Sequence, residues 1–502
     1  MSQPDREAPD LDGQLGRFRA VRHTLESSVL PLATSIDGRR FHFQASLYGL
    51  PFRLGGYCVV VDGDGRARLG QILSLTIESR GGAELDLPPR DGLSEVMRTE
   101  VTIRVARGEG VLLDGDQEPF HDAVVRPASA EHVRGWLTRS LRGRATLEIG
   151  ELTPIGGVGC AVRASGFDRH TFLCGQSGSG KTYALGLILE RLLLETSLRI
   201  VVLDPNSDFV RLTDLRAGVP PATSSRYAER AKEIGVYTAG DAGAHRLRLR
   251  FGDLEPAAQA ALLRLDPIAD REEYAELAEL VETQTPRTVE TFLGRPRNEA
   301  GRLALRVRNL GVERFVVWSR GQSGSVLDAV SGAERCVVVD LGSLSSLEEQ
   351  ALVAASVLGH LWNSRGDRAP LLVVVDEAHN VCPGRPGDPL TALATDYVVR
   401  IAAEGRKFGR YLLLSTQRPQ KVHENILSQC DNLVLMRLNS AADAAFTKTI
   451  FSFVPGALVD SASTFRLGEG LVAGKISPHP ALLRFGARLT EEGGADVPAT
   501  WA

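Results

Sequence analysis

The chain has 502 residues, of which 43% are hydrophobic, and this content excludes a wholly disordered protein. Its 58 basic and 62 acidic residues leave a formal net charge of -4, so no overall positive field attracts a polyanion and any contact with nucleic acid must be local. The cysteines lack C-x-x-C spacing, and no uncharged window is long enough to cross a bilayer. We therefore expect a soluble, cytoplasmic protein without membrane insertion, built from about two to four domains.

The first part of the chain is expected to be a flexible arm followed by a β domain. Residues 1–28 mix charges with Asp, Gly and Pro and show no sustained period, which is typical of an arm with at most one short helix. Residues 29–152 contain short β-type runs, the last at 145–149, separated by turn signals such as Asp62-Gly-Asp-Gly65 and Arg107-Gly-Glu-Gly110. This pattern predicts a small barrel or sandwich, a module that serves assembly or docking more often than catalysis.

A glycine-rich motif lies between the apolar run 170–174 and a helical pattern at 183–194. Its residues are Gly175, Gln176, Ser177, Gly178, Ser179, Gly180, Lys181 and Thr182, with Tyr183 directly after them. This is the order of a P-loop, in which backbone N–H groups surround the phosphates, Lys181 reaches the β- and γ-phosphates and the Thr182 hydroxyl binds Mg²⁺. Because both flanks fit, we expect a site for ATP and Mg²⁺ rather than a loop that only turns the chain.

Residues 153–490 alternate between buried strands and helices. Further strands are predicted at 199–203, 336–339, 371–375, 411–414 and 433–436. The alternation predicts an α/β fold with a doubly wound, mostly parallel sheet that binds its ligand at the carboxyl ends of the strands. Residues 205–333 interrupt it as a largely helical insertion, and residues 491–502 are expected to be a tail. In the insertion, Arg302, Arg306 and Arg308 share a helix, which is either a solvated face or a surface for DNA or a neighbouring subunit.

Paired acids follow the apolar run 371–375. At such a strand tip one carboxylate holds Mg²⁺ and the next polarises the attacking water, so Asp376 is the expected metal-side acid and Glu377 the expected general base. The alternative for Asp376 is a helix N-cap. Gln417, at the tip of the next strand, is placed to sense the γ-phosphate. Arg406 and Arg169 are candidates for an arginine finger donated by a neighbouring subunit, or else are ordinary surface ion-pair partners.

These motifs resemble those of the HerA-type ATPases of the HerA/FtsK superfamily. The matching residues include Leu147-Glu-Ile-Gly150, Asp204-Pro-Asn-Ser-Asp-Phe209, Asp376-Glu-Ala-His379, Glu404-Gly-Arg-Lys-Phe408 and Ser415-Thr-Gln-Arg-Pro419. The resemblance implies an N-terminal β-barrel of the HAS-barrel kind, a RecA-like P-loop core and a homo-oligomeric, hexameric ring. It also implies that Arg169 and Arg406 act between subunits. Asn206 and Asp208 stand where family members often carry His and Glu, which leaves the role of that loop open.

The function that the resemblance implies is an ATP-hydrolysing ring motor that translocates on or unwinds double-stranded DNA in a central channel. Such proteins work with a separate partner, for instance a NurA-like nuclease or an effector protein in defence against phage. Two alternatives remain: an ATP-regulated scaffold for an effector enzyme, and a soluble coupling ATPase of a DNA-transfer apparatus. We find no nuclease constellation in the sequence, so DNA cutting would have to come from the partner.

Overall fold

The computed structural model describes residues 11–81, 84–87, 97–100, 102–115, 117–240, 245–283, 301–320 and 324–494. The chain forms two compact units. The first comprises Met1–Arg139 with Pro154–Val158, and the second comprises Ser140–Thr153 with Gly159–Ala502. The expected tail at 491–502 lies outside the described residues from residue 495 onward. Within the described residues no helix is both long and apolar enough to span a membrane.

The first unit begins with helix α1 (Leu11–Ser27), where we expected a flexible arm. The end of the helix is held by Glu26, whose carboxylate accepts a hydrogen bond from the Arg104 backbone N–H at 2.7 Å and one from Arg22 Nε at 2.9 Å. Glu26 is buried, and a buried carboxylate is stable only when its oxygens have such partners. The contact with Arg104 is long-range, so the local sequence pattern gives no sign of it.

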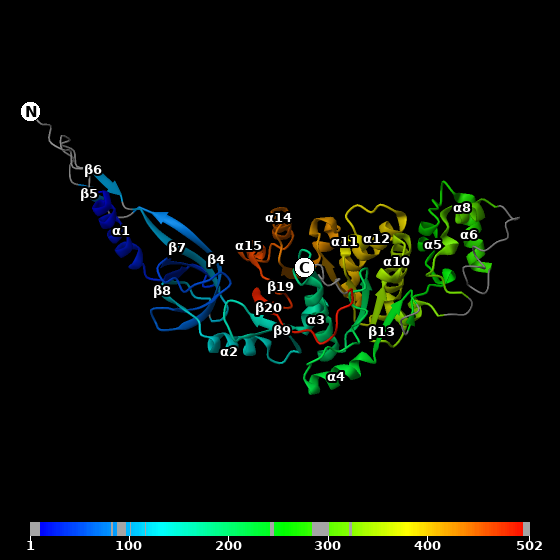
Figure 1. Cartoon of the computed structure of the whole chain (residues 1–502), viewed down its shortest axis with the longest axis horizontal. Helices are drawn as coiled ribbons and strands as arrows, with labels where there is room; N and C mark the ends of the chain where they lie inside the picture. Colours follow the sequence, from blue (N-terminus) through cyan, green and yellow to red (C-terminus); the bar gives the residue numbers. More distant parts are fainter. Residues whose placement is uncertain are drawn as a thin grey trace, which may run out of the picture. The chain divides into compact units, whose positions relative to one another are not determined.

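Six strands of the first unit close into a barrel (Figure 1). In barrel order they are β1 (Leu32–Ser35), β2 (Arg40–Ser46), β7 (Ile103–Leu112), β4 (Ala67–Arg80), β3 (Tyr57–Val61) and β8 (Phe120–Pro127). A separate two-stranded sheet joins β5 (Glu84–Leu87) to β6 (Met97–Glu100). The predicted turn at 62–65 is confirmed: it joins β3 to β4 in a hairpin, and Asp62 accepts hydrogen bonds from the N–H groups of Asp64 and Arg66.

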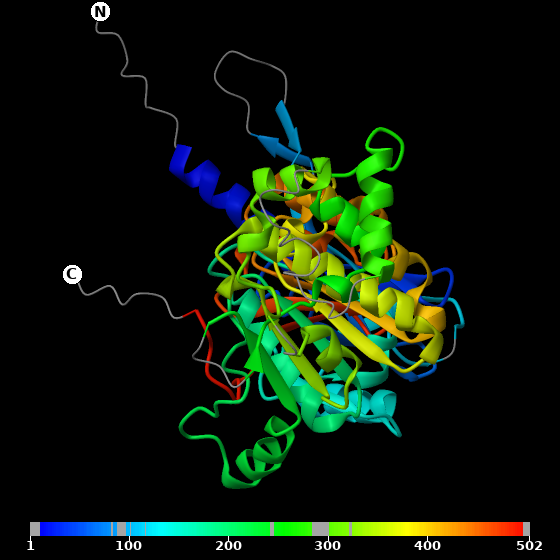
Figure 2. The same ribbon diagram turned by 90° about the vertical axis from the view of Figure 1, so that its right-hand side faces the viewer.

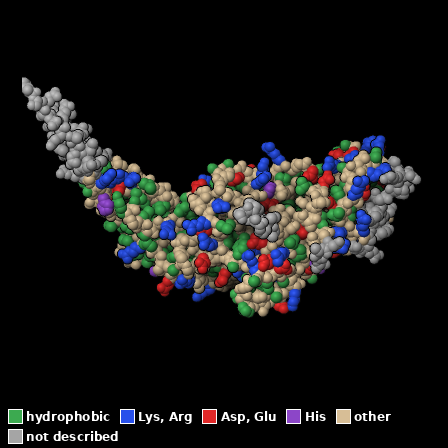
Figure 3. Space-filling model, viewed as in Figure 1, with side chains coloured by type: hydrophobic (Ala, Val, Ile, Leu, Met, Phe, Trp, Pro, Cys, Tyr) green, Lys and Arg blue, Asp and Glu red, His purple; other side chains and the backbone are tan. Residues whose placement is uncertain are grey.

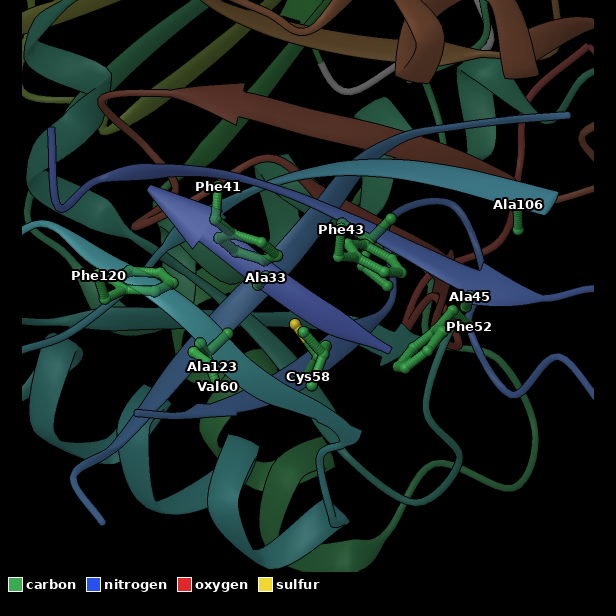
Figure 4. Close-up of a cluster of buried hydrophobic side chains, with 12 residues drawn as sticks. Ala33, Phe41, Phe43, Ala45, Phe52, Cys58, Val60, Ala106, Phe120 and Ala123 are labelled. Atoms are coloured by element: carbon green, nitrogen blue, oxygen red, sulfur yellow. The ribbon is translucent and has the colours of Figure 1, made fainter. Parts of the chain in front are cut away.

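The barrel core explains why the predicted turn at Arg107-Gly-Glu-Gly110 is wrong. Phe41 and Phe43 on β2 point into the barrel (Figure 4), and the two glycines lie opposite them on the continuous strand β7. A Cβ at Gly108 would lie 2.1 Å from the Phe43 ring, and a Cβ at Gly110 would lie 2.2 Å from the Phe41 ring. The glycines therefore make room for aromatic side chains and do not mark a turn.

The second unit is built on a twelve-stranded mixed sheet, which confirms the α/β class. In sheet order its strands are β10 (Gly159–Arg163), β9 (Thr146–Leu152), β20 (Ala481–Phe485), β19 (Glu469–Gly474), β18 (Cys430–Met436), β11 (His170–Cys174), β17 (Arg410–Thr416), β16 (Leu371–Val375), β12 (Arg199–Asp204), β15 (Cys336–Asp340), β13 (Ile234–Thr238) and β14 (His245–Arg246). The strands from β18 to β14 are parallel, whereas β19, β20, β9 and β10 pair antiparallel. All six strands predicted between residues 170 and 436 are present.

Helices cover both faces of this sheet. The chain moves one way across the sheet through α3 (Lys181–Glu195) and α4 (Pro221–Ala231), and returns through α10 (Leu347–Asn363) and α12 (Pro389–Glu404). Because crossovers between parallel strands are right-handed, the two directions place their helices on opposite faces. Helices α10 and α12 pack against each other and lie together in both views (Figure 1, Figure 2). Consequently the parallel strands are buried on both sides.

One expectation about strand placement is wrong, and another is incomplete. We assigned residues 145–149 to the N-terminal β domain, but β9 pairs with β10 and β20 in the large sheet. The insertion 205–333, expected to be largely helical, contains helices but also the strand β13, which pairs with β15 and extends the same sheet. Both β9 and β13 pair with a strand more than a hundred residues away, β20 and β15 respectively, and the local sequence pattern does not reveal such a partner.

The remaining described helices of the insertion are α5 (Pro256–Leu262), α6 (Arg271–Thr283), α8 (Arg302–Leu310) and α9 (Val326–Ser331). The arginines of α8 are engaged locally: Arg306 pairs with Asp270 at 2.7 Å and Glu273 at 3.0 Å, and Arg302 pairs with Glu272 at 3.2 Å. These ion pairs favour the interpretation of an ordinary surface face. On the side of the molecule drawn in Figure 3, basic and acidic side chains are likewise interspersed.

Candidate functional site

The glycine-rich motif forms the turn between β11 and α3. Gly178 and Gly180 adopt left-handed backbone conformations, with φ of 70° and 88°, which side chains with a Cβ rarely adopt. Gly175 is required for a different reason: a Cβ there would lie 2.5 Å from Met436 Cβ and 2.8 Å from Ser179 Oγ. The predicted P-loop residues therefore occupy one tight loop at the start of α3.

The segment that directly follows the neighbouring strand β18 holds this loop by hydrogen bonds. The Gln176 backbone N–H donates to the Arg437 carbonyl at 2.9 Å, and the Gln176 side-chain oxygen accepts from the Asn439 N–H at 3.1 Å. Arg437 also donates from its guanidinium to the Gly178 carbonyl at 3.1 Å. No local pattern pointed to Arg437, because its role depends on β18 lying next to β11. These bonds fix the loop before any ligand binds.

Lys181 connects the loop to the paired acids. Its Nζ lies 3.0 Å from Asp376 Oδ1, 3.0 Å from Glu377 Oε1 and 3.1 Å from Ser415 Oγ. Burial by itself would lower the pKa of Lys181, but the two carboxylates outweigh it and raise that pKa. The lysine therefore carries a positive charge at the position where phosphate oxygens would meet it.

The surroundings of Glu377 keep its carboxylate ionised, which is the form that can accept a proton. Burial works to raise its pKa, yet the hydrogen bond from His379 and the charge of Lys181 lower it to about 2. The carboxylate is thus ionised, and His379 Nδ1 lies 3.1 Å from Glu377 Oε2 and 3.0 Å from Thr416 Oγ1. The backbone of Glu377 is left-handed, with φ of 40°, an uncommon conformation for a residue with a side chain.

The N-cap alternative for Asp376 is wrong. The short helix α11 (Ala378–Val381) begins after Glu377, which occupies the cap position and makes no side-chain capping bond. Asp376 instead lies at the end of β16, fully buried, with Oδ1 on Lys181 and with no hydrogen-bond partner for Oδ2. A buried carboxylate oxygen without a partner is costly unless a cation or water meets it.

A cation fits beside that oxygen. Ligand atoms of Asp204, Asp208 and Asp376 all lie within 4.8 Å of one another, and oxygen donors of this kind suit Mg²⁺. Burial raises the pKa of Asp204 to about 8, and burial together with the charge of Asp376 raises the pKa of Asp208 to about 6. Thr182 is half-buried in the first turn of α3, directly after Lys181, and its binding of the ion stays a prediction. The sequence analysis assigned no role to Asp208, although the segment 204–209 was among the motifs that resemble the HerA-type ATPases.

The remaining predicted residues divide between the two ends of the parallel strands. Gln417 directly follows β17, which lies between β11 and β16, so it shares the carboxyl end with Lys181 and Asp376. Arg406 and Arg169 lie at the amino end, where both approach Asp431: Arg406 Nη1 at 2.9 Å and Arg169 Nε at 3.5 Å from Oδ2. The five residues of β11 separate the two ends by about 16 Å.

A further element that the sequence did not reveal braces the P-loop helix. We call residues 486–494 the strap. The Arg488 backbone N–H donates to the Tyr183 hydroxyl at 2.8 Å, and the Gly493 N–H donates to the Asp208 carbonyl at 3.1 Å. Glu190 of α3, fully buried, accepts from Arg488 Nε at 3.2 Å and from the backbone N–H groups of Leu489 and Thr490. The strap therefore joins α3 to the loop that carries Asp208.

Comparison with known proteins finds a match for the segment that carries the P-loop. Residues 147–304 match the family model described as the central domain of helicase HerA. This central segment is similar to that of HerA helicases. The match begins at β9, includes the whole P-loop and the Asp204–Phe209 loop, and ends inside the insertion.

Part of the chain is also similar to curated HerA helicases. A DNA double-strand break repair helicase HerA from Sulfurisphaera tokodaii is 31% identical over 173 residues, which are 32% of this chain and 33% of the relative. One from Pyrococcus furiosus is 34% identical over 116 residues, 23% of this chain and 20% of the relative. The matched part thus spans a third or less of the length of these two relatives. Among solved structures, VirB4 of Thermoanaerobacter pseudethanolicus aligns with 69% of this chain and 97% of its own, at 16% identity and a TM-score of 0.47.

Proposed function

We propose that this HerA-type chain is an ATP-hydrolysing ring motor that moves on or unwinds double-stranded DNA. The observation that carries the proposal is the position of Lys181 Nζ, 3.0 Å from both Asp376 and Glu377. A P-loop lysine in contact with paired acids at neighbouring strand ends is the arrangement that phosphoryl transfer from ATP requires. In this proposal the large sheet is a RecA-like core, and the six-stranded barrel is an assembly module of the HAS-barrel kind.

Each residue then has one task. The P-loop N–H groups and Lys181 bind the phosphates, Glu377 accepts the proton of the attacking water and Gln417 orients that water or the γ-phosphate. Thr182, Asp376 and Asp208 would hold Mg²⁺, which supplies electrostatic stabilisation of the phosphates when bound.

The arginines support a ring, which we propose to be hexameric. Arg169 and Arg406 lie about 16 Å from their own P-loop along β11, so they are too far to reach phosphates bound there. Both side chains are more than a third exposed, at 38% and 39%. In this proposal Arg169 and Arg406 therefore act on the phosphates of a neighbouring subunit, where an arginine would stabilise the transferred phosphoryl group. A partner nuclease or defence effector would supply any DNA cleavage.

The test is a size measurement combined with ATPase assays in the presence and absence of linear duplex DNA. We expect a ring-sized species whose ATPase is stimulated by DNA. Lys181→Ala should abolish turnover, and Glu377→Gln should bind ATP but turn it over at least a hundredfold more slowly, in line with the loss of a general base (on the order of 10²–10⁴).

Other outcomes discriminate between the candidate functions. Normal turnover by either variant would mean that the site is misplaced. ATPase that is indifferent to DNA, together with a stable complex between the ring and an effector, would point to the scaffold function instead. Activity that depends on a membrane channel would point to the coupling ATPase.

A further inference from the structure

Two loops meet at the carboxyl end of the large sheet, beside the ATP site. The first, residues 382–387, directly follows the short helix α11, and the second, residues 418–423, directly follows Gln417. We call them the paired loops, because an antiparallel bridge and two hydrogen bonds join their backbones. The bridge links Pro383 to Val422, the Gly384 N–H donates to the Lys421 carbonyl at 2.8 Å, and the His423 N–H donates to the Cys382 carbonyl at 3.1 Å.

The paired loops carry three cations and no Asp or Glu. Arg385, Arg418 and Lys421 are all exposed, and within the described part of the chain none of their side chains makes an ion pair or a hydrogen bond. The flanking acids are Asp388, whose oxygens accept hydrogen bonds within the first turn of α12, and Glu424. The paired loops therefore present a local positive charge in a chain whose net charge is -4.

The composition of the paired loops favours a phosphate backbone as the ligand. Exposed guanidinium and ammonium groups bind backbone phosphates whatever the base sequence is. Sites for single strands add aromatic rings on which the bases stack, and the paired loops contain no Phe, Tyr or Trp. Exposed cations without such rings therefore fit the outside of a duplex better than they fit unstacked bases.

The paired loops are also connected to the groups of the ATP site. Helix α11 begins directly after Glu377 and carries His379, whose Nδ1 lies 3.1 Å from Glu377 Oε2 and 3.0 Å from Thr416 Oγ1. The second loop contacts the same hydroxyl, because the Arg418 backbone N–H donates to Thr416 Oγ1 at 3.0 Å. A ligand that holds both loops would therefore also restrict His379 and Gln417, the residue next to Arg418.

We propose that the paired loops bind phosphates of duplex DNA through Arg385, Arg418 and Lys421, and that this contact accelerates ATP hydrolysis by holding Glu377 and Gln417 in place. The inference rests on the proposed function, a motor on double-stranded DNA. It adds the residues that contact the DNA and the route from that contact to the ATP site. Because the contact is to phosphates alone, it is independent of base sequence.

The test uses the full chain with Arg385→Ala/Lys421→Ala. This variant removes two of the three cations and leaves Arg418, whose backbone binds Thr416. Both replaced side chains are exposed, so the thermal unfolding midpoint should stay within about 2 °C of the wild-type value, as for surface substitutions. If it falls further, Arg385→Gln/Lys421→Gln takes the place of the alanine variant, because it removes the same charges and keeps longer side chains.

Two controls separate the local charge from other effects. Arg142→Ala/Lys475→Ala removes one arginine and one lysine that are likewise exposed and that have no side-chain partner among the residues that the structure describes. Arg385→Lys/Lys421→Arg keeps both charges in the paired loops and exchanges the side chains. Both controls should bind DNA as the wild type does, since backbone phosphates require positive charge at this place and not one particular side chain.

The first readout is the binding of a fluorescein-labelled duplex of about 30 base pairs, measured by anisotropy over a salt series. The alanine variant should bind about tenfold more weakly, or weaker still, at low salt. The slope of log K against log salt should become shallower by about 1.8 for each subunit that contacts the duplex, at roughly 0.9 per phosphate contact.

The second readout is the ATPase rate with and without the same duplex. The alanine variant should keep the wild-type rate without DNA, because it retains Lys181, Glu377 and Gln417, and it should lose most of the stimulation by DNA. Equal binding and equal stimulation in variant and wild type would overturn the inference and leave the motor function standing. An equal loss in either control would also overturn it.

Two further outcomes are distinguishable from these. Full stimulation of the alanine variant at saturating duplex, despite weaker binding, would overturn the route from the paired loops to the ATP site. Wild-type protein that hydrolyses ATP without binding the duplex would refute the motor itself, and this inference with it.

Discussion

At the scale of single residues, Glu377 combines an ionised carboxylate with a strained backbone. A residue with a Cβ in the left-handed region costs on the order of 1–3 kcal/mol, and such strain persists only where the surroundings hold it. Here the Glu377 carbonyl accepts from the Asn380 N–H at 2.7 Å, and the side chain is held by Lys181 and His379. The left-handed backbone of Glu377 thus places its carboxylate beside Lys181 and lowers the free energy of unfolding.

This leads to a prediction about stability. Glu377→Gly should be more stable than Glu377→Ala by about 1 kcal/mol, because both lose the carboxylate and only glycine adopts the left-handed conformation freely. Urea unfolding of the two variants measures the difference, and neither should hydrolyse ATP. An alanine variant that is as stable as the glycine variant would show that the backbone at this position carries no strain.

His170 is expected to make the fold acid-sensitive. Burial, reinforced by the charge of Arg406, lowers the pKa of His170 to about 4, and its Nδ1 accepts the Leu412 backbone N–H at 3.0 Å. The unfolded chain, with an ordinary histidine pKa near 6.5, therefore binds a proton more readily, so this contribution to stability is lost as the pH falls below about 6.5 and toward 4. Between pH 7 and pH 5 the loss is about 2 kcal/mol.

The variant His170→Asn isolates this effect. Its side-chain oxygen can accept the same N–H bond but does not titrate, so the free energy of unfolding should change less between pH 7 and pH 5 than in the wild type. Denaturation curves at the two pH values measure the difference. His121→Asn, at an exposed histidine, is the control and should follow the wild type. Identical pH dependence in the His170 variant and the wild type would rule out the buried neutral histidine.

At the scale of elements, the strap determines how firmly α3 is held. Arg488 and Glu190 are both fully buried, so removal of one leaves an unpaired charge in the interior. Arg488→Met should therefore reduce the free energy of unfolding by about 3–5 kcal/mol. Arg484→Met removes an arginine four residues away whose side chain is 58% exposed, and it should cost no more than about 1 kcal/mol.

A double variant separates charge from packing in the strap. If the cost of Arg488→Met arises from the stranded Glu190 carboxylate, then Glu190→Leu added to it should recover a large part of the loss. Chemical denaturation of the single and double variants measures this coupling. A purely additive double variant would mean that Arg488 acts through its packing alone.

The elements also show which parts of the fold the sequence could predict. The strand at 371–375 was predicted with its observed bounds because it is buried on both faces and reads as an unbroken apolar run. Gly108 and Gly110 were wrongly interpreted as a turn, because glycine also occurs where a strand must leave space for an aromatic ring, here those of Phe43 and Phe41. The strap and Arg437 gave no signal, since each acts through a partner that only the folded chain brings near. The P-loop and the paired acids were predictable because each is a local motif. The proximity of Asp208 to Asp376 was not predictable, because it depends on two segments that are distant in the sequence.

At the scale of the whole molecule, the proposed exchange of arginines between subunits makes a quantitative prediction. Arg406→Ala and Glu377→Gln should each be inactive alone, yet a mixture should regain turnover, because a Glu377-bearing subunit can receive Arg406 from its neighbour. With random mixing at equal amounts, about one site in four has both groups, so activity should peak there at about a quarter of the wild-type rate. Steady-state ATPase over a series of mixing ratios measures this curve.

A second mixture is the control. Arg169 and Arg406 lie together on Asp431 and would be donated by the same subunit. If each single variant is inactive, mixing Arg169→Ala with Arg406→Ala should restore nothing, since no subunit in that mixture carries both. Rescue in the control, or its absence at every ratio in the first mixture, would contradict donation of both arginines from one edge.

The shared contact with Asp431 has a consequence for kinetics. A solitary copy keeps the guanidinium groups of Arg169 and Arg406 on an internal carboxylate, away from its own triphosphate, so its turnover should be close to nil. The rate per copy should then rise with protein concentration and level off only when assembly is complete. Dilution alone would switch the protein off, with no change in covalent structure or in the nucleotide supplied.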